Sequence, residues 1–148
     1  MHGVDDQRVL DAVRTYVKLQ RASHAINART EPRLTQAGLT HTQLGVLEAL
    51  LHLGPLTQRE LTRKLLTSPG NLTDVIDKLA KRALVERHRC PEDRRSVRVV
   101  LTPAGQSFIA GLFPDHARDI AHAMAGLSAE DLASLERMLR QLGLHAAS

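Results

Sequence analysis

The chain has 148 residues, of which 43% are hydrophobic but only 2% aromatic, and this composition favours a helical interior of aliphatic side chains over a β-sandwich. No apolar run approaches the ~18 residues that a membrane span needs, and the N-terminus lacks the layout of an export signal. We therefore expect a cytoplasmic protein without a membrane partner, and the single cysteine, Cys90, agrees with a reducing compartment.

Positive charge is concentrated in the middle of the chain. Residues 54–105 hold 11 Lys and Arg against 6 Asp and Glu, whereas the remainder holds 9 against 10. A concentrated basic patch is typical of proteins that bind a polyanion, because neutralised phosphates release their counterions. A solvated face without function is an equally common reason for an excess of this size. Charge alone leaves both interpretations open.

The first elements are helical. Apolar residues at helical spacing predict a long helix over residues 5–30, and Pro32 predicts that it ends or kinks near Thr30. A capping box from Thr40 to Gln43 predicts the start of a second helix, in which the two side chains satisfy each other's unpaired backbone donors.

Two more helices follow in the basic region. A capping box from Thr57 to Glu60 opens a short helix, and Ser68 with Pro69 opens another that runs to about Arg82. Small and hydrogen-bonding groups occupy the exposed first turn of this helix. Its predicted outward-facing residues are Gly70, Asn71, Asp74, Lys78 and Lys81.

Residues 84–90 and 97–101 have a β-like pattern and predict a two-stranded hairpin with arginines at its tip. A long helix then begins at Pro103, with a bend at Pro114, and a last helix begins at Ser128. This order predicts a mainly α fold with a small β-hairpin wing, which is a winged helix-turn-helix.

In such a fold the capped helix would enter the major groove of DNA. Asn71 suits adenine, and Ser68 or Thr73 suits a phosphate or a base, although each residue taken alone is more often a cap or a solvated side chain. Arg94 and Arg95 at the hairpin tip would reach a neighbouring minor groove. An ion pair between Asp93 and a flanking arginine would fix the direction of that arginine before binding.

The stretch SPGNLTDVIDKLAKRALVERHRCPEDRRSVRVVLTPAG resembles the recognition helix and wing of the MarR family, the multiple antibiotic resistance regulators. The resemblance extends through QAGLTHTQLGVLEALL before it and FPDHARDIAHAMAGLSAEDLASLERMLRQLG after it, and the D-x-R wing followed by LTPAG is its most specific part. One departure is Ala83, where the family commonly has glycine; in a left-handed backbone alanine would cost about 1 kcal/mol. The expected DNA-binding residues are Gln58, Ser68, Gly70, Asn71, Thr73, Lys78, Asp93, Arg94 and Arg95.

The resemblance also implies an assembly. It implies a single domain, 1–148, in which residues 40–102 form the DNA-binding lobe and residues 5–38 and 103–148 form dimerisation helices. A homodimer of this kind reads an inverted repeat in double-stranded DNA. Proteins of the family usually respond to small molecules, often aromatic acids, so we expect a transcriptional regulator, usually a repressor, that a small ligand releases. The sequence identifies neither the operator nor the inducer.

Other classes of function were weighed against this one. A winged helix that binds only proteins is the main alternative, because the fold alone does not establish DNA binding. A metal-responsive regulator is another, but the histidines beside the expected crevice, His24, His41, His116 and His122, lack i, i+4 pairing, so we expect neither a metal nor a cofactor. Cys90 is better explained as a small strand residue than as a peroxide sensor. No phosphate loop, G-x-S-x-G or H-E-x-x-H motif is present, so we expect no enzyme.

Overall fold

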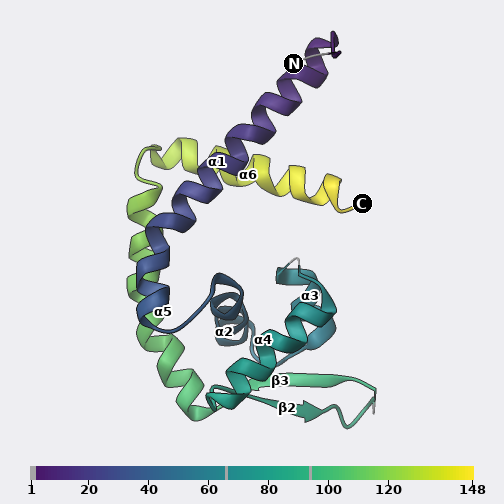
Figure 1. Ribbon diagram of the computed structural model, residues 1–148, viewed down its shortest axis with the longest axis vertical. Helices are drawn as coiled ribbons and strands as arrows, with labels where there is room; N and C mark the ends of the chain where they lie inside the picture. The colour runs from purple at the N-terminus through teal and green to yellow at the C-terminus, as the bar shows by residue number, and fades with distance from the viewer. Residues whose placement is uncertain (1–2, 66, 94) are drawn as a thin grey trace. The chain divides into compact units, whose positions relative to one another are not determined.

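The protein forms six α-helices and one small antiparallel sheet within residues 3–65, 67–93 and 95–148, which the computed structural model describes (Figure 1). The mainly helical fold with a β-hairpin wing is confirmed. In chain order the elements are α1 (Gln7–Gln36), α2 (His41–Leu53), β1 (Leu56–Thr57), α3 (Gln58–Leu65), α4 (Pro69–Lys81), β2 (Val85–Arg89), β3 (Val97–Leu101), α5 (Pro103–Ala123) and α6 (Ala129–Ala146).

The chain divides into two compact units. The first contains the residues up to Arg29 together with those from Arg118 onward, and the second contains residues 30–117. The predicted dimerisation segments, residues 5–38 and 103–148, each have residues in both units. The end of α1 and the beginning of α5 thus complete the body that carries α3, α4 and the hairpin.

Among the residues that the structure describes, the buried hydrophobic core lies entirely in the second unit. Side chains such as Leu47, Leu61 and Leu79 have no exposed surface, and each buried side chain of this size contributes about 1.5 to 3 kcal/mol to stability. The core residues are Leu34, Leu39, Leu44, Val46, Leu47, Leu50, Leu56, Leu61, Leu72, Val75, Ile76, Leu79, Leu84, Val85, Val99 and Ile109. This packing gives α3 and α4 a rigid support.

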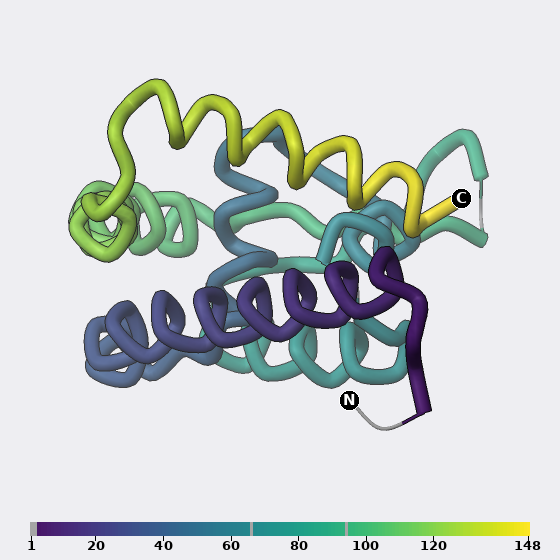
Figure 2. The backbone as a smooth tube through the Cα atoms, turned by 90° about the horizontal axis from the view of Figure 1, so that it is seen from above, coloured from purple at the N-terminus to yellow at the C-terminus, as the bar shows by residue number. Residues whose placement is uncertain are grey.

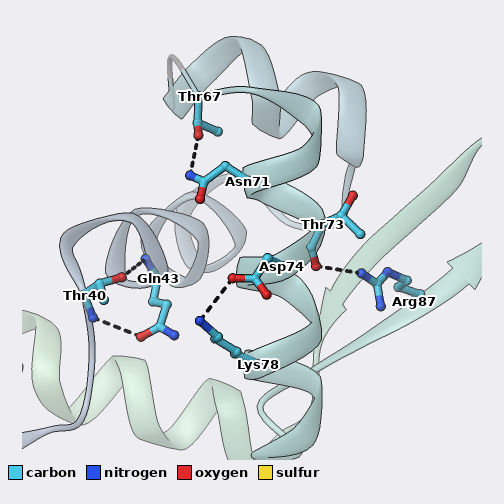
Figure 3. Close-up of polar contacts among 8 residues, drawn as sticks. All are labelled: Thr40, Gln43, Thr67, Asn71, Thr73, Asp74, Lys78 and Arg87. Carbon is cyan, nitrogen blue, oxygen red and sulfur yellow. Dashed lines mark hydrogen bonds and ion pairs between the residues drawn. The ribbon is translucent and has the colours of Figure 1, made fainter.

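The predicted helix starts of the second unit are confirmed by their caps. The Gln43 backbone N–H donates to the Thr40 hydroxyl oxygen at 3.1 Å, and the Gln43 amide oxygen accepts from the Thr40 N–H at 2.9 Å (Figure 3). Thr57 and Glu60 form the same reciprocal pair, with both distances 3.1 Å. Local hydrogen bonds therefore fix where α2 and α3 begin.

Of the two outcomes predicted at Pro32, an end or a kink of the first helix, the end is wrong. Helix α1 continues through Pro32 to Gln36 instead of ending near Thr30. Proline removes one backbone donor from a helix, and here buried contacts on both sides oppose that loss, since Thr30 is 2% exposed and Leu34 only 1%. Helix α5 is one long helix, as predicted, and contains Pro114, where a bend was expected.

The predicted hairpin is present as β2 and β3, which pair antiparallel from Val85 opposite Leu101 to Arg89 opposite Val97. A third strand, β1, was not predicted; it pairs with the other edge of β3 and places Leu56 opposite Val99. Two residues are too few to show an alternating pattern. Because β1 leads directly into α3, the base of the wing is fixed to the start of that helix.

The first unit has a different character, because none of its described residues is buried. Figure 2 shows α6 leaving the end of α5 after a short turn. Helices α1 and α6 line an open apolar groove of about 590 Å³. Its aliphatic and methionine side chains include Leu19, Ile26, Leu135, Met138 and Leu142.

Candidate nucleic-acid interface

Helix α4 exposes a capped first turn. The Asn71 backbone N–H donates to the Ser68 hydroxyl oxygen at 3.1 Å, and Pro69 occupies the first helical position, where its missing donor costs nothing. Gly70 is exposed, and a Cβ placed there would meet no atom within 4 Å. A ligand can therefore approach the backbone of this turn closely.

The Asn71 side chain is already hydrogen-bonded in the free protein. Its amide nitrogen donates to the hydroxyl oxygen of Thr67 at 2.7 Å (Figure 3). A bidentate contact to adenine uses the amide nitrogen and oxygen together. Reading a base in that way thus requires Asn71 to share or exchange its bond with Thr67.

Thr73 and Gln58 lie together, one on α4 and one at the start of α3. The Thr73 hydroxyl donates to the Pro69 carbonyl oxygen at 3.0 Å and accepts from the Gln58 amide nitrogen at 3.4 Å. These two residues line a hollow of about 400 Å³ with Arg59 and Arg63. The structure therefore brings two predicted residues beside two arginines of α3.

Arg59 and Arg63 were not among the predicted DNA-binding residues. Their spacing of four residues places both on one face of α3, and Leu61 faces inward with no exposed surface. That helical spacing was the signal available in the sequence. Lys78, which was predicted, lies farther along α4 and pairs with Asp74 at 3.1 Å (Figure 3). Both side chains are more than 60% exposed, so the pair contributes at most about 1 kcal/mol to stability.

Asp93 shapes the tip of the wing through the chain itself. Its carboxylate accepts a hydrogen bond from the Arg95 backbone N–H at 2.9 Å and another from the Ser96 hydroxyl at 3.0 Å. Both hydrogen bonds hold the pKa of the Asp93 carboxyl below its ordinary value, and the bond from the Arg95 backbone has the larger effect. The Ser96 N–H also donates to the Asp93 carbonyl oxygen at 3.1 Å, which closes the turn.

The predicted ion pair between Asp93 and a flanking arginine is absent for Arg95, the flanking arginine that the structure describes. Within the described part of the chain Asp93 bonds no arginine side chain, and Arg94 lies outside the described residues. An aspartate at the start of a turn readily accepts backbone bonds from the residues that follow it. Asp93 therefore orients Arg95 through the backbone and not through its guanidinium.

The wing and α3 enclose a shared hollow of about 530 Å³. Arg59 and Arg95 both line it, so two cations from different elements face the same space beside the Asp93 carboxylate. The lining residues are Thr57, Gln58, Arg59, Asp93, Arg95, Ser96 and Val97. Asn71 and Lys78 lie on α4 and do not line this hollow.

Other kinds of site find little support. Among the described residues no group of three or more His, Cys, Asp or Glu side chains could hold a metal ion. Cys90 is 6% exposed and directly follows β2, at the end of the strand nearest the hairpin turn. No helix in the described ranges is long and apolar enough to cross a membrane.

The chain is similar to known proteins over most of its length. A model of the MarR family matches residues 39–97. The chain is 33% identical over 135 residues to the HTH-type transcriptional regulator MhqR of Bacillus subtilis (strain 168), with 91% of this chain and 93% of MhqR covered.

Two solved structures have similar folds. One is BpsR from Bordetella bronchiseptica, whose DNA binding is regulated by 6-hydroxynicotinic acid. It is 26% identical to this chain with a TM-score of 0.79, and the match covers 88% of this chain and 98% of the BpsR chain. The other is NadR in complex with 4-hydroxyphenylacetate, which is 25% identical, has a TM-score of 0.76, and covers 85% of this chain and 89% of its own.

Proposed function

The chain belongs to the MarR family of DNA-binding transcriptional regulators, whose members are not enzymes, and we propose that it acts as a homodimeric repressor of this kind. It binds an inverted repeat in double-stranded DNA, and a small aromatic acid lowers its affinity for that DNA. The observation that carries the proposal is the exposed, capped first turn of α4 in the same unit as the hollow shared by Arg59 and Arg95.

Each part of this surface has a separate task. The first turn of α4 reads base edges in the major groove through Asn71 and Thr73, and Gly70 permits close approach. Arg59 and Arg95 bind backbone phosphates and supply affinity that does not depend on sequence. The bonds of Asp93 hold the tip of the wing in one conformation before binding, which lowers the entropy cost of ordering it.

The apolar surface of the first unit supports the homodimer. Among the described residues, ten of the eleven large exposed hydrophobic side chains lie in this unit, which includes no buried side chain. A patch of this kind marks a protein interface. A second copy is the occupant we propose, because a closed two-fold dimer buries the same face of both chains.

The dimer explains the form of the operator. Two copies of α4 related by a two-fold axis read two half-sites about 34 Å apart, which is one turn of DNA, and this arrangement requires an inverted repeat. We propose an aromatic acid because 6-hydroxynicotinic acid regulates the DNA binding of BpsR, and NadR was solved in complex with 4-hydroxyphenylacetate. Such a ligand acts only if it binds the two states of the protein with different affinities.

Selection of bound sequences from random DNA tests this function, followed by a gel-shift titration with and without each aromatic acid. We expect an inverted repeat to be enriched and the Arg95→Ala variant to bind it more weakly with a smaller salt dependence, since one phosphate contact is lost. Enrichment of no sequence, or equal affinity of the Arg95→Ala variant, contradicts the assignment of this surface.

A further inference from the structure

We propose that Arg87 is a positioning residue for DNA binding, because its guanidinium holds the wing strand β2 against α4 and the start of α3. This inference rests on the proposed function and concerns a residue outside the predicted DNA-binding set. Arg87 does not itself bind DNA in this proposal. It sets the position of the wing relative to the recognition helix.

The guanidinium contacts three groups on two helices. Its Nη1 lies 2.7 Å from the Asp77 carboxylate on α4, and its Nη2 donates to the Thr73 carbonyl oxygen at 3.3 Å. Its Nε donates to the Gln58 amide oxygen on α3 at 3.1 Å. Figure 3 shows Arg87 reaching from the hairpin towards Thr73. One side chain therefore connects β2, α3 and α4.

Arginine is required for this arrangement. The planar guanidinium presents several donors in fixed directions, whereas the ammonium of lysine is a single point charge. The Arg87 side chain is 30% exposed, and its pair with Asp77 is therefore less screened than the more exposed pair of Asp74 and Lys78. We expect Arg87→Lys to lose most of the positioning effect.

The bonds of Arg87 also orient a predicted DNA contact. Because Arg87 occupies the Gln58 amide oxygen, the Gln58 amide nitrogen is turned towards the Thr73 hydroxyl oxygen, 3.4 Å away. Loss of Arg87 frees the Gln58 amide to rotate. Both the position of the wing and the orientation of Gln58 then become variable.

Charge distinguishes positioning from simple attraction to DNA. The charge of Arg87 is balanced by Asp77, so the pair contributes no net charge to the surface. Asp77→Asn makes the protein more positive, and electrostatic attraction alone predicts tighter binding to every DNA. If Arg87 acts through its bonds, the same change lowers the preference for the selected sequence.

Arg89 provides a matched control. It lies two residues farther along β2, so its side chain projects from the same face of the strand. Within the described part of the chain the Arg89 side chain has no hydrogen bond or ion pair. Arg89→Ala therefore removes one positive charge from the same strand without removing a bond between elements.

The experiment measures fluorescence anisotropy of the full chain with the selected duplex and with a scrambled duplex. For Arg87→Ala, Arg87→Lys and Asp77→Asn we expect the preference for the selected over the scrambled duplex to fall about tenfold, the equivalent of one charge-assisted hydrogen bond, whatever each change of charge does to the affinity for both duplexes. Arg89→Ala should weaken binding to both duplexes equally. Circular dichroism checks the fold, which Asp77→Asn should retain because Asp77 is 52% exposed.

Two failures are distinguishable. If the wild-type protein binds neither duplex, the proposed function is wrong. If the wild-type protein binds, while Asp77→Asn and Arg87→Lys keep its preference for the selected duplex, Arg87 is not a positioning residue. Tighter binding of Asp77→Asn to both duplexes by the same factor leads to the same conclusion, since it shows attraction between charges only.

Discussion

Ala83 adopts a backbone conformation that suits glycine better than alanine. Its φ is 56°, in the left-handed region where a Cβ crowds the following carbonyl group. The angle allows the chain to end α4, since the Leu84 N–H then donates to the Leu79 carbonyl oxygen at 3.1 Å. The left-handed backbone in which alanine would cost about 1 kcal/mol is therefore present at Ala83.

Ala83→Gly should therefore stabilise the protein. We expect the free energy of unfolding to rise by about 1 kcal/mol, because glycine adopts this φ without strain. Ala80→Gly, inside α4, is the matched control and should lower it by about 1 kcal/mol. Thermal denaturation followed by circular dichroism measures both. A melting temperature that falls in the Ala83→Gly variant contradicts this account of the turn.

Glu48 is a second residue in an unfavourable position. Burial raises the pKa of its carboxyl above the ordinary value, while His116 and His52 oppose the shift. One carboxylate oxygen lies 3.5 Å from the His116 Nε2, a long separation, and that oxygen and the His116 Nδ1 are both buried without a hydrogen-bond partner in the described structure. Ionised Glu48 is therefore poorly solvated.

The raised pKa gives a pH dependence with a definite sign. The folded state binds the Glu48 proton more tightly than the unfolded state, so stability falls as pH rises through the folded pKa. Glu48→Gln removes this ionisation. The variant should thus gain stability relative to wild type as pH increases from 4 to about 7. Urea unfolding across this range measures the free energy of unfolding of the variant relative to wild type. A relative stability that falls with rising pH would contradict this account.

At the scale of elements, the start of α5 is fixed to the turn after α4. The Thr102 hydroxyl donates to the Ala83 carbonyl oxygen at 2.6 Å and accepts from the Gly105 N–H at 2.9 Å. A Cβ on Gly105 would overlap the Leu84 carbonyl oxygen. The L-T-P-A-G stretch therefore combines a helix cap, Thr102, with a glycine, Gly105, that leaves room for the backbone of Leu84.

Gly105→Ala should destabilise the protein by about 1 to 3 kcal/mol or more, because the added methyl group meets rigid backbone. Gly111→Ala is the control on the same helix, where an added Cβ meets no atom within 4 Å. That change should raise stability by up to about 1 kcal/mol through helix propensity. Equal stability of the two variants in chemical denaturation would show that α5 can move away from Leu84.

The elements that could be predicted from sequence are those whose cause is local. The starts of α2, α3 and α4 depend on side chains within three residues of the cap, so they are visible in the sequence. The passage of α1 through Pro32 and the pairing of β1 depend on contacts distant in sequence. The same holds for the site: Ser68 could be recognised locally, whereas the contact of Arg87 with Gln58 spans 29 residues.

At the scale of the whole molecule, the two units differ in how they are stabilised. The second contains the entire buried core, whereas the first has apolar faces on α1 and α6 without a buried residue among those described. A helix pair that buries so little gains little stability by itself. The proposed homodimer provides the missing burial.

A charged residue on this face should separate the two copies. Leu142 is 50% exposed and lines the groove between α1 and α6, so Leu142→Glu should give a monomer that retains the second unit's fold. Leu53→Glu places the same charge on an exposed leucine of α2, 57% exposed, and should remain dimeric. Sedimentation equilibrium decides between these outcomes. A wild-type monomer, or a dimeric Leu142→Glu variant, contradicts this interface.

The most direct test of the central claim is a titration of the selected inverted-repeat duplex with the wild-type chain at several salt concentrations. We predict two chains per duplex and a steep linear fall of the logarithm of affinity with the logarithm of salt concentration, because each phosphate contact releases counterions. One chain per duplex, or affinity that does not change with salt, would contradict a dimer that grips DNA through α4 and the wing. Absence of binding would favour a winged helix that contacts only proteins.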